Sequence, residues 1–370
     1  MKTITISVIN DLATDQRVGR MAETLSGEGF EIQLIGRRLP GSLPPPAGFR
    51  VRRFRMLFRR GPFFYVFFNI RLFFYLLFRS KVVLYTAVDL DTLPASYLAA
   101  RIRRIPILYD SHEYFTEVPE LADRPRTRGV WKKIEALIVP HLSLGIAVSD
   151  HIATAYQEEY GTGFITIRNV SRSGKPETDD AFSSAYPSKY RVIYQGALNM
   201  GRGLELMIDA MQWMQDTVLF IVGDGDIRDE LQERVFRLKL TDRVVFPGRV
   251  PPAQLFSITS QCHLGLSLEE DLGLNYRYAL PNKIFDYIQA RVPVLCSDLP
   301  EMAALISSHG VGEVCRSREP AELAFQMKEM LRDETKRVEW KLYLEEAARQ
   351  LCWENEESKL KEVVSKILAT

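Results

Sequence analysis

The sequence predicts an α/β protein of two Rossmann-like domains, each built on a doubly wound parallel sheet. Three observations predict this class. The 370 residues exceed the length at which one hydrophobic core usually stops growing. Short β-rich runs alternate with helical patterns in both halves, which is typical of parallel sheets covered on both faces. Residues 171–188 are rich in Ser, Pro, Gly and Asp and lack apolar periodicity, which indicates a linker.

The expected elements follow in chain order within these boundaries. In the N-terminal domain, 1–170, we expect a helix at 15–29 and strands at 3–9, 30–36, 82–86, 105–109, 143–148 and 164–168. In the C-terminal domain, 189–345, we expect helices at 203–214, 226–239 and 282–290 and strands at 191–195, 217–222, 243–246, 263–267 and 292–296. An amphipathic helix at 352–368 belongs to a last segment, 346–370. This segment is expected to pack back on a domain, the N-terminal one being favoured.

Composition narrows the class of protein. The chain is 46% hydrophobic and 26% charged with a net charge of +1, which argues against disordered and fibrous classes and against nucleic acid as a partner. Its four cysteines have no C-x-x-C or other close spacing, so we expect neither a disulfide scaffold nor a zinc site. The first residues lack the pattern of a signal peptide, and we therefore expect a cytoplasmic protein.

A candidate phosphate site follows strand 191–195. The loop from Gly196 to Gly203 leads into a helix and carries Arg202 near its end. Backbone amides at a helix start and a guanidinium both favour an anion such as a diphosphate. The alternative is a plain strand–helix turn with a surface Arg, because the G-x-G-x-x-G and P-loop fingerprints are absent.

A second candidate begins the predicted helix 282–290. Pro281 and Asn282 are suited to a helix start, and Lys283 follows in the first turn. A cation there opposes the helix dipole at a cost of a few tenths of a kcal/mol, roughly up to 1, unless an anion binds beside it. This favours phosphate binding over a solvated helix face. Asp286 lies about one turn on and suits ribose hydroxyls.

Polar residues also follow two strands of the first half. His112 comes directly after strand 105–109 and is placed to contact a sugar or phosphate oxygen, although helix capping by Asp110 or Ser111 explains the same segment. The first loop carries Asp11 and Arg17 and has no glycine run for a pyrophosphate. Its groups suit acceptor hydroxyls, and the alternative is a capping Asp with an exposed Arg.

Several spaced segments follow one another in a specific order over nearly the whole chain. The N-terminal half contributes INDLATDQRVGRMAETLSGEGFEIQLIGR and DSHEYFTEVPE. The C-terminal half contributes VIYQGALNMGRGLELMIDAM, FIVGDGDIRDEL, VVFPGRVPPAQLFSI and NKIFDYIQARVPVLCSDLPEM. Each segment is weak evidence alone, but the set in this order is specific, and it resembles the family-four retaining glycosyltransferases of the GT-B fold.

The resemblance implies transfer with retention, with the nucleotide sugar bound mainly by the C-terminal half across a cleft between the domains, and with no metal or other cofactor. By position, Arg202 and Lys283 would hold the diphosphate, His112 would contact the transferred sugar and Asp286 would bind ribose. The remaining donor-binding candidates are Gly196, Arg249, Val250, Tyr278 and Asn282. The acceptor-binding candidates are Asp11, Arg17 and Glu117.

Two departures from the family pattern bear on the sugar contacts. The paired glutamates of the family appear here as Tyr278 and Asp286, and the usual Arg after the first glycine of the second half is Ala197. Ala197 leaves Arg202 with more of the phosphate charge. A catalytically silent nucleotide-sugar-binding protein is therefore one alternative function.

Residues 50–81 hold nine of the twenty Phe, framed by arginines. A transmembrane helix is disfavoured because the stretch from Arg60 to Arg79 contains Gly61, Pro62 and a central Arg71. Dense aromatics edged by arginines match a helix at an anionic bilayer surface. A buried core or interdomain helix explains the pattern equally well.

These observations together predict a hexosyltransferase. It would act from a UDP- or GDP-sugar onto a glycan or lipid-linked acceptor at the inner face of the plasma membrane, in cell-envelope or capsular polysaccharide synthesis. A nucleotide-sugar epimerase of the same two-domain fold is the rival enzyme. That enzyme would use acid–base carboxylates and histidines in place of an acceptor site.

Overall fold

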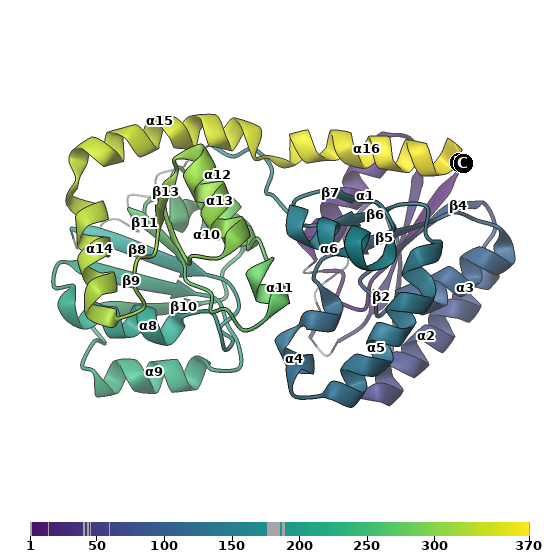
Figure 1. Cartoon of the computed structure of the whole chain (residues 1–370), viewed down its shortest axis with the longest axis horizontal. Helices are drawn as coiled ribbons and strands as arrows, with labels where there is room; N and C mark the ends of the chain where they lie inside the picture. Colours follow the sequence, from purple (N-terminus) through teal and green to yellow (C-terminus); the bar gives the residue numbers. More distant parts are fainter. Residues whose placement is uncertain are drawn as a thin grey trace. The chain divides into compact units, whose positions relative to one another are not determined.

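Two α/β units make up the chain in the computed structural model (Figure 1). The structure describes residues 2–13, 15–39, 41, 42, 44, 46–58, 60–175, 186 and 189–369. One unit comprises Met1–Asn169 and Asn355–Thr370, and the other comprises Val170–Glu354. Most of the linker expected at 171–188 lies outside the described residues. Arg59 also lies outside them; it belongs to residues 50–81, which we call the aromatic segment.

The first unit holds a seven-stranded sheet in the order β3-β2-β1-β4-β5-β6-β7, with every neighbouring pair parallel. Its strands are β1 (Thr3–Ser7), β2 (Glu31–Arg37), β3 (Arg50–Phe54), β4 (Val82–Val88), β5 (Ile107–Ser111), β6 (Gly145–Ala147) and β7 (Phe164–Thr166). Its helices are α1 (Gln16–Gly27), α2 (Pro62–Leu77), α3 (Leu93–Arg103), α4 (Pro119–Ala122), α5 (Pro125–Ile138), α6 (Asp150–Tyr160) and α16 (Trp353–Ala369).

Strand order reverses between β1 and β4 in this sheet. All five residues of β1 are buried because parallel neighbours and helices cover it. The next helix, α1, begins where the Asp15 side chain accepts a hydrogen bond from the backbone N–H of Val18, a standard N-cap. Loops after β1 and β4 therefore diverge at the carboxyl edge, where open α/β sheets bind ligands.

The second unit holds a six-stranded parallel sheet in the order β10-β9-β8-β11-β12-β13. Its strands are β8 (Tyr190–Gln195), β9 (Thr217–Val222), β10 (Val244–Gly248), β11 (Leu264–Ser267), β12 (Val294–Cys296) and β13 (Gly312–Val314). Its helices are α8 (Leu204–Ala210), α9 (Arg228–Arg237), α10 (Pro252–Ser260), α11 (Leu274–Arg277), α12 (Asn282–Gln289), α13 (Pro300–His309), α14 (Pro320–Arg332) and α15 (Glu334–Gln350). Helices α8 and α9 lie on one face and α12 and α13 on the other (Figure 1).

The predicted fold class is confirmed, and the expected strands recur with small shifts of their ends. Two strands were not expected, β3 and β13. Strand β3 lies at a sheet edge within the arginine-rich start of 50–81, where charged side chains hide the apolar alternation. Strand β13 is three residues long, too short for a periodic pattern.

The last helix, α16, belongs to the first unit from Asn355 onward. Its apolar residues are buried, and the Glu356 carboxylate accepts a hydrogen bond from the backbone N–H of Arg168 at 3.0 Å. Lys361 pairs with Glu28 at 3.1 Å. Residues 346–354, which the sequence placed in the C-terminal segment, lie in the second unit.

The aromatic segment forms the helix α2 over Pro62–Leu77, and one stripe of it enters the core. Phe64, Phe68, Leu72 and Leu76 are buried at helical spacing. The opposite side of the helix leaves large apolar residues exposed: Phe63, Val66, Ile70 and Phe74. In the part of the chain that the structure describes, no helix has the length and apolar character that crossing a bilayer requires.

Candidate functional site

Two cations and one carboxylate converge at the carboxyl edge of the second sheet. Glu269 lies two residues after β11, and Lys283 lies in the first turn of α12. The Lys283 ammonium is 2.6 Å from Oε1 of Glu269, and both side chains are buried, at 8% and 1% exposure. Arg202, from the loop between β8 and α8, reaches the same oxygen at 3.7 Å. We call Arg202, Lys283 and Glu269 the cation cluster.

Burial and charge oppose each other in the cation cluster. Burial lowers the pKa of Lys283 below its usual value, although Glu269 acts in the other direction. Burial also raises the pKa of Glu269, but Lys283, Arg202 and the Ser267 hydroxyl, which donates at 2.7 Å, outweigh it and hold that pKa below its usual range. The cluster therefore places two cationic side chains around one carboxylate.

Close backbone contacts place the predicted loop against this cluster. Gly196 has a φ of +139°, and a Cβ there would lie 3.5 Å from Cε of Lys283. Gly203, with a φ of +70°, lies so near the Leu268 carbonyl that a Cβ would be 2.1 Å from its oxygen. Only glycine allows this approach. The loop from 196 to 203 thus runs beside the segment that carries Glu269.

The other predicted donor-binding residues occupy different surroundings. Asp286 lies one turn after Lys283 and accepts hydrogen bonds from the Gln195 amide, at 2.8 Å, and from the Ser171 hydroxyl. Asn282 is exposed at the start of α12 and Tyr278 is half-buried at the end of α11. The remaining two follow β10: Arg249, 77% exposed and 3.5 Å from Asp224, and Val250, which is half-buried.

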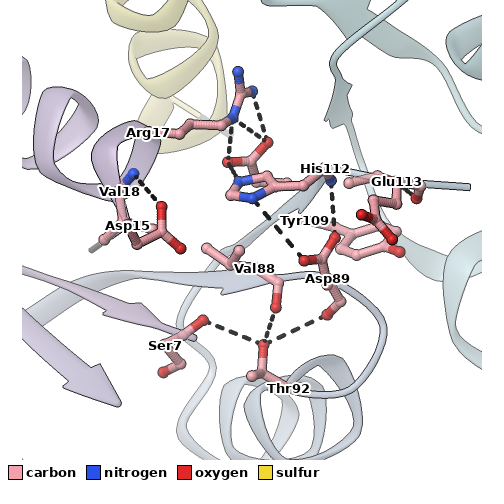
Figure 2. A network of polar contacts seen from close by, with 12 residues as sticks. Ser7, Asp15, Arg17, Val18, Val88, Asp89, Thr92, Tyr109, His112 and Glu113 are labelled. Carbon is pink, nitrogen blue, oxygen red and sulfur yellow. Dashed lines mark hydrogen bonds and ion pairs between the residues drawn. The ribbon is translucent and has the colours of Figure 1, made fainter. Parts of the chain in front are cut away.

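The carboxyl edge of the first sheet carries a buried network around His112 (Figure 2). Nε2 of His112 lies 2.8 Å from Asp110, at the end of β5, and Nδ1 lies 4.0 Å from Asp89, in the loop after β4. The Asp89 carboxylate also accepts a hydrogen bond from the His112 backbone N–H at 2.9 Å. Arg17 pairs with Asp110 from the other side at 2.8 Å.

These contacts fix the charge of the imidazole. Burial alone would lower the pKa of His112, but Asp110 and Asp89 outweigh it and raise that pKa to about 9. Burial would likewise raise the pKa of Asp110, but Arg17 and His112 hold it well below its usual range. His112 is therefore an imidazolium at neutral pH, 15% exposed at the sheet edge.

Arg17, one of the acceptor candidates, lies in the interior of the first unit. Its side chain is 1% exposed, and its guanidinium donates to Asp110 and, at 2.7 Å, to the carbonyl of Ile167. Arg17 lies in the first turn of α1, which Asp15 caps, and its side chain is buried. It positions Asp110, and through it His112, instead of lining an open surface.

The two other acceptor candidates lie nearer the surface. Asp11 follows β1 and contacts the hydroxyl of Ser42 and, at 3.6 Å, the guanidinium of Arg53. Glu117 ends a short 3₁₀ turn and pairs with Arg128 and, at 3.4 Å, with Lys132.

Sequence reasoning missed Glu269 and Asp89, and treated Asp110 only as a helix cap. All three are carboxylates within two residues of a strand's carboxyl end. Open α/β sheets bind ligands at that edge, so this position in the sequence could have identified them. Within the described residues no three His, Cys, Asp or Glu side chains are grouped to hold a metal ion.

Two family models match successive parts of the chain. The model described as Glycosyltransferase Family 4 matches residues 15–169, and the model described as Glycosyl transferases group 1 matches residues 176–348. The chain belongs to the group 1 glycosyltransferases. This glycosyltransferase is therefore a transferase enzyme, as the sequence predicted. A comparison with curated proteins gives no match.

Solved structures agree with this glycosyltransferase in fold over nearly its whole length. Sucrose-phosphate synthase from Thermosynechococcus elongatus aligns with a TM-score of 0.82 at 14% identity, covering 100% of both chains. Anabaena HepE in complex with UDP and glucose aligns at 0.77 and 17% identity, covering 99% and 100%. WaaG, a glycosyltransferase involved in lipopolysaccharide biosynthesis, aligns at 0.71 and 14%, covering 97% and 99%. The GT-B fold is confirmed.

Proposed function

We propose that this glycosyltransferase moves a hexose with retention from a UDP- or GDP-sugar to a glycan or lipid-linked acceptor at an anionic membrane surface, in the synthesis of a cell-envelope or capsular polysaccharide. The observation that carries the proposal is the cation cluster. A buried lysine and a nearby arginine converge beside a glycine-lined loop at the edge where open α/β sheets bind ligands. We propose no metal or other cofactor in this reaction.

A diphosphate suits the cation cluster for a charge reason. Lys283 and Arg202 both lie beside the Glu269 carboxylate, at 2.6 and 3.7 Å, so two cationic side chains are brought together at one place. A nucleoside diphosphate supplies oxygens for bidentate and charge-assisted hydrogen bonds from both cations. UDP is the first nucleotide to test, because structures of Anabaena HepE contain UDP and UDP-glucose.

In the reaction, the cations would stabilise charge that grows on the diphosphate as the sugar–phosphate bond breaks. The acceptor hydroxyl would form the new bond to the anomeric carbon from the same face, and its proton would pass to the leaving phosphate oxygen. His112, held as an imidazolium by Asp110 and Asp89, would donate a hydrogen bond to the transferred sugar. Asp286 would accept hydrogen bonds from the ribose hydroxyls.

A membrane-associated acceptor is supported by the exposed side of α2. Phe63 and Phe74 are 71% and 54% exposed, and Phe78 just beyond the helix is 82% exposed. The neighbouring α3 packs on α2 and adds two exposed apolar residues, Leu98 and Ile102. A contiguous apolar face of this kind marks an interaction site on a protein surface.

Basic residues accompany this apolar face. Arg60 precedes α2, while Arg79 and Lys81 follow it, and all three are exposed. The α3 helix adds Arg101, and Arg104 follows it. Exposed aromatics with a basic margin match an anionic bilayer surface, where burial of apolar groups and charge attraction act together.

The donor is tested by thermal unfolding with UDP, GDP, ADP and their sugars, since a ligand selective for the folded state raises Tm. We expect a rise with UDP or GDP and their sugars only. Incubation of the selected sugar nucleotide with and without acceptor then separates the rival enzyme. An isomerised sugar nucleotide formed without acceptor would reject the transferase in favour of an epimerase.

Membrane contact is tested by sedimentation with vesicles of phosphatidylcholine and of phosphatidylcholine with phosphatidylglycerol. We expect binding to the anionic vesicles, weakened by Phe63→Ser with Phe74→Ser and, separately, by Arg60→Glu with Arg79→Glu. Phe236→Ser, at a 74% exposed position in α9, is the matched control. Equal sedimentation of all variants would reject the membrane surface.

A further inference from the structure

One buried carboxyl of the first unit has an oxygen without a hydrogen-bond partner in the described part of the chain. Asp91 lies in the loop between β4 and α3, two residues after Asp89, and is 6% exposed. Its Oδ1 is buried and lacks a hydrogen-bond partner among the described residues. A buried carboxyl oxygen without a partner destabilises a protein, so its presence calls for a reason outside the fold.

The backbone around Asp91 is held firmly. The Asn69 side chain, from α2, donates to the Asp91 carbonyl at 2.7 Å and accepts from the Ala95 backbone N–H at 3.1 Å. The Thr92 hydroxyl donates to the Val88 carbonyl at 2.7 Å (Figure 2). These contacts hold the backbone that carries the carboxyl, while one oxygen of that carboxyl lacks a hydrogen-bond partner among the described residues.

Asp91 lies at the same edge of the sheet as His112. It follows β4, and His112 follows the neighbouring β5, so both lie beyond the carboxyl ends of parallel strands. Burial, followed by Asp89, raises the pKa of Asp91 well above its usual value. The ionisable side chains that act on Asp91, or on which it acts, come from the ends of neighbouring strands and from α2: Arg37, Tyr65, Asp89, His112 and Glu113.

A second unsatisfied polar atom accompanies Asp91. Arg37 ends β2, and its Nε is buried with no hydrogen-bond partner in the described part of the chain. Its guanidinium lies 5.2 Å from the centre of the Phe64 ring of α2. A donor at the end of β2 and an acceptor in the loop after β4 thus both lack a partner among the described residues, and β2 and β4 are the two strands that flank β1.

We infer that Asp91 binds a hydroxyl of the acceptor sugar, with Arg37 as a second polar contact. The inference rests on the proposed function and names a residue of its acceptor site. A hydroxyl both donates and accepts, so it suits the carboxyl in either protonation state. A hydroxyl suits the site better than a phosphate, because ionised Asp89 and Asp91 would repel an anion. Asn69 joins this site to α2, whose outer side is the proposed membrane face.

The test is Asp91→Asn, which keeps the shape of the side chain and removes its charge. We expect the variant to unfold at a Tm about 3 °C higher than the wild type at about pH 7.5, because the destabilising carboxylate is gone. Towards about pH 4 the difference should shrink, since the wild-type carboxyl is then neutral and a raised pKa destabilises only above its unfolded value.

Activity is measured with the selected sugar nucleotide and three acceptors, the hexyl glycosides of glucose, galactose and mannose. We expect the acceptor KM of Asp91→Asn to rise about tenfold or more, with hydrolysis of the donor unchanged. Asp123→Asn, an exposed carboxyl of the same unit, is the control and should change neither Tm nor KM.

A lower or unchanged Tm for Asp91→Asn overturns the inference, because a structural carboxyl stabilises its fold. An unchanged acceptor KM overturns it as well. If the wild type transfers sugar to none of the three glycosides, the proposed function fails for such acceptors. The difference in Tm between the wild type and Asp91→Asn then shows separately whether the Asp91 carboxyl destabilises the folded protein.

Discussion

Replacing Lys283 by Met should separate the contribution of the cation cluster to stability from its contribution to donor binding. Met keeps the length of the side chain but removes the ammonium that lies 2.6 Å from Glu269. Glu269 is 1% exposed and would keep only the Ser267 hydroxyl at 2.7 Å and the guanidinium of Arg202 at 3.7 Å. The variant therefore leaves an undercompensated charge in the interior.

The expected magnitudes follow from burial. Removing one partner of a buried ion pair costs about 3–5 kcal/mol, which lowers Tm by about 10 °C for a domain of this size. Adding Glu269→Gln removes the stranded charge, so the double variant should recover most of this loss. Both variants lose the charge-assisted hydrogen bond that the Lys283 ammonium would donate to a diphosphate. UDP or GDP should therefore bind about 10- to 100-fold more weakly to both.

The assay is isothermal titration with the nucleotide that stabilises the wild type, beside thermal unfolding of each variant. Lys341→Met, at an exposed position in α15, is the control for loss of a lysine and should match the wild type in both measurements. The reasoning is refuted if the double variant binds the nucleotide within about twofold of the wild type, because the phosphate role of Lys283 would then be absent.

Three further predictions concern the first unit. Arg17→Met should cost about 3–5 kcal/mol in unfolding free energy, measured in urea, because Asp110 stays buried with only His112 beside it. Burial raises the pKa of Glu135 to about 7. The free energy of unfolding should therefore fall by up to about 3 kcal/mol as pH rises from about 4.5 through 7. The Glu135→Gln variant should not show this fall. Against the opposing effect of burial, Asp110 and Asp89 raise the pKa of His112 to about 9. The stability that protonated His112 adds is thus fully present below about pH 6.5 and is lost as pH rises through 9. The His112→Gln variant should lack this pH-dependent loss. Unfolding of both proteins at about pH 7 and 10 measures the difference.

Much of the fold was predictable because it depends on local patterns. The buried runs of β1 and β9 are continuous apolar or β-branched segments, and their alternation with helices predicts parallel sheets. Strand β3 escaped prediction because arginines dominate an edge strand. The sequence left open whether α2 is buried or lies at a bilayer surface. In the structure one stripe of α2 is buried and another is exposed.

The candidate site was predictable in part. Arg202 and Lys283 were found from their positions at the starts of helices, and the structure brings both to one carboxylate. Glu269 itself was missed, because its pairing with Lys283 depends on β11 lying beside β8 and under α12. The pairing of Arg17 with Asp110 was not predicted for the same reason, since the two residues are distant in sequence.

The sequence by itself determined the two sheets, the succession of strands and helices, and which cations follow a strand or open a helix, because these depend on residues close together in the chain. Only the tertiary structure decided which charges meet. The pairing of Arg17 with Asp110, the Asp–His–Asp arrangement around His112 and the isolation of Asp91 arise where strands remote in sequence become neighbours at one sheet edge. Burial there strengthens each pairing and makes each unpaired group costly, and no local pattern encodes that environment.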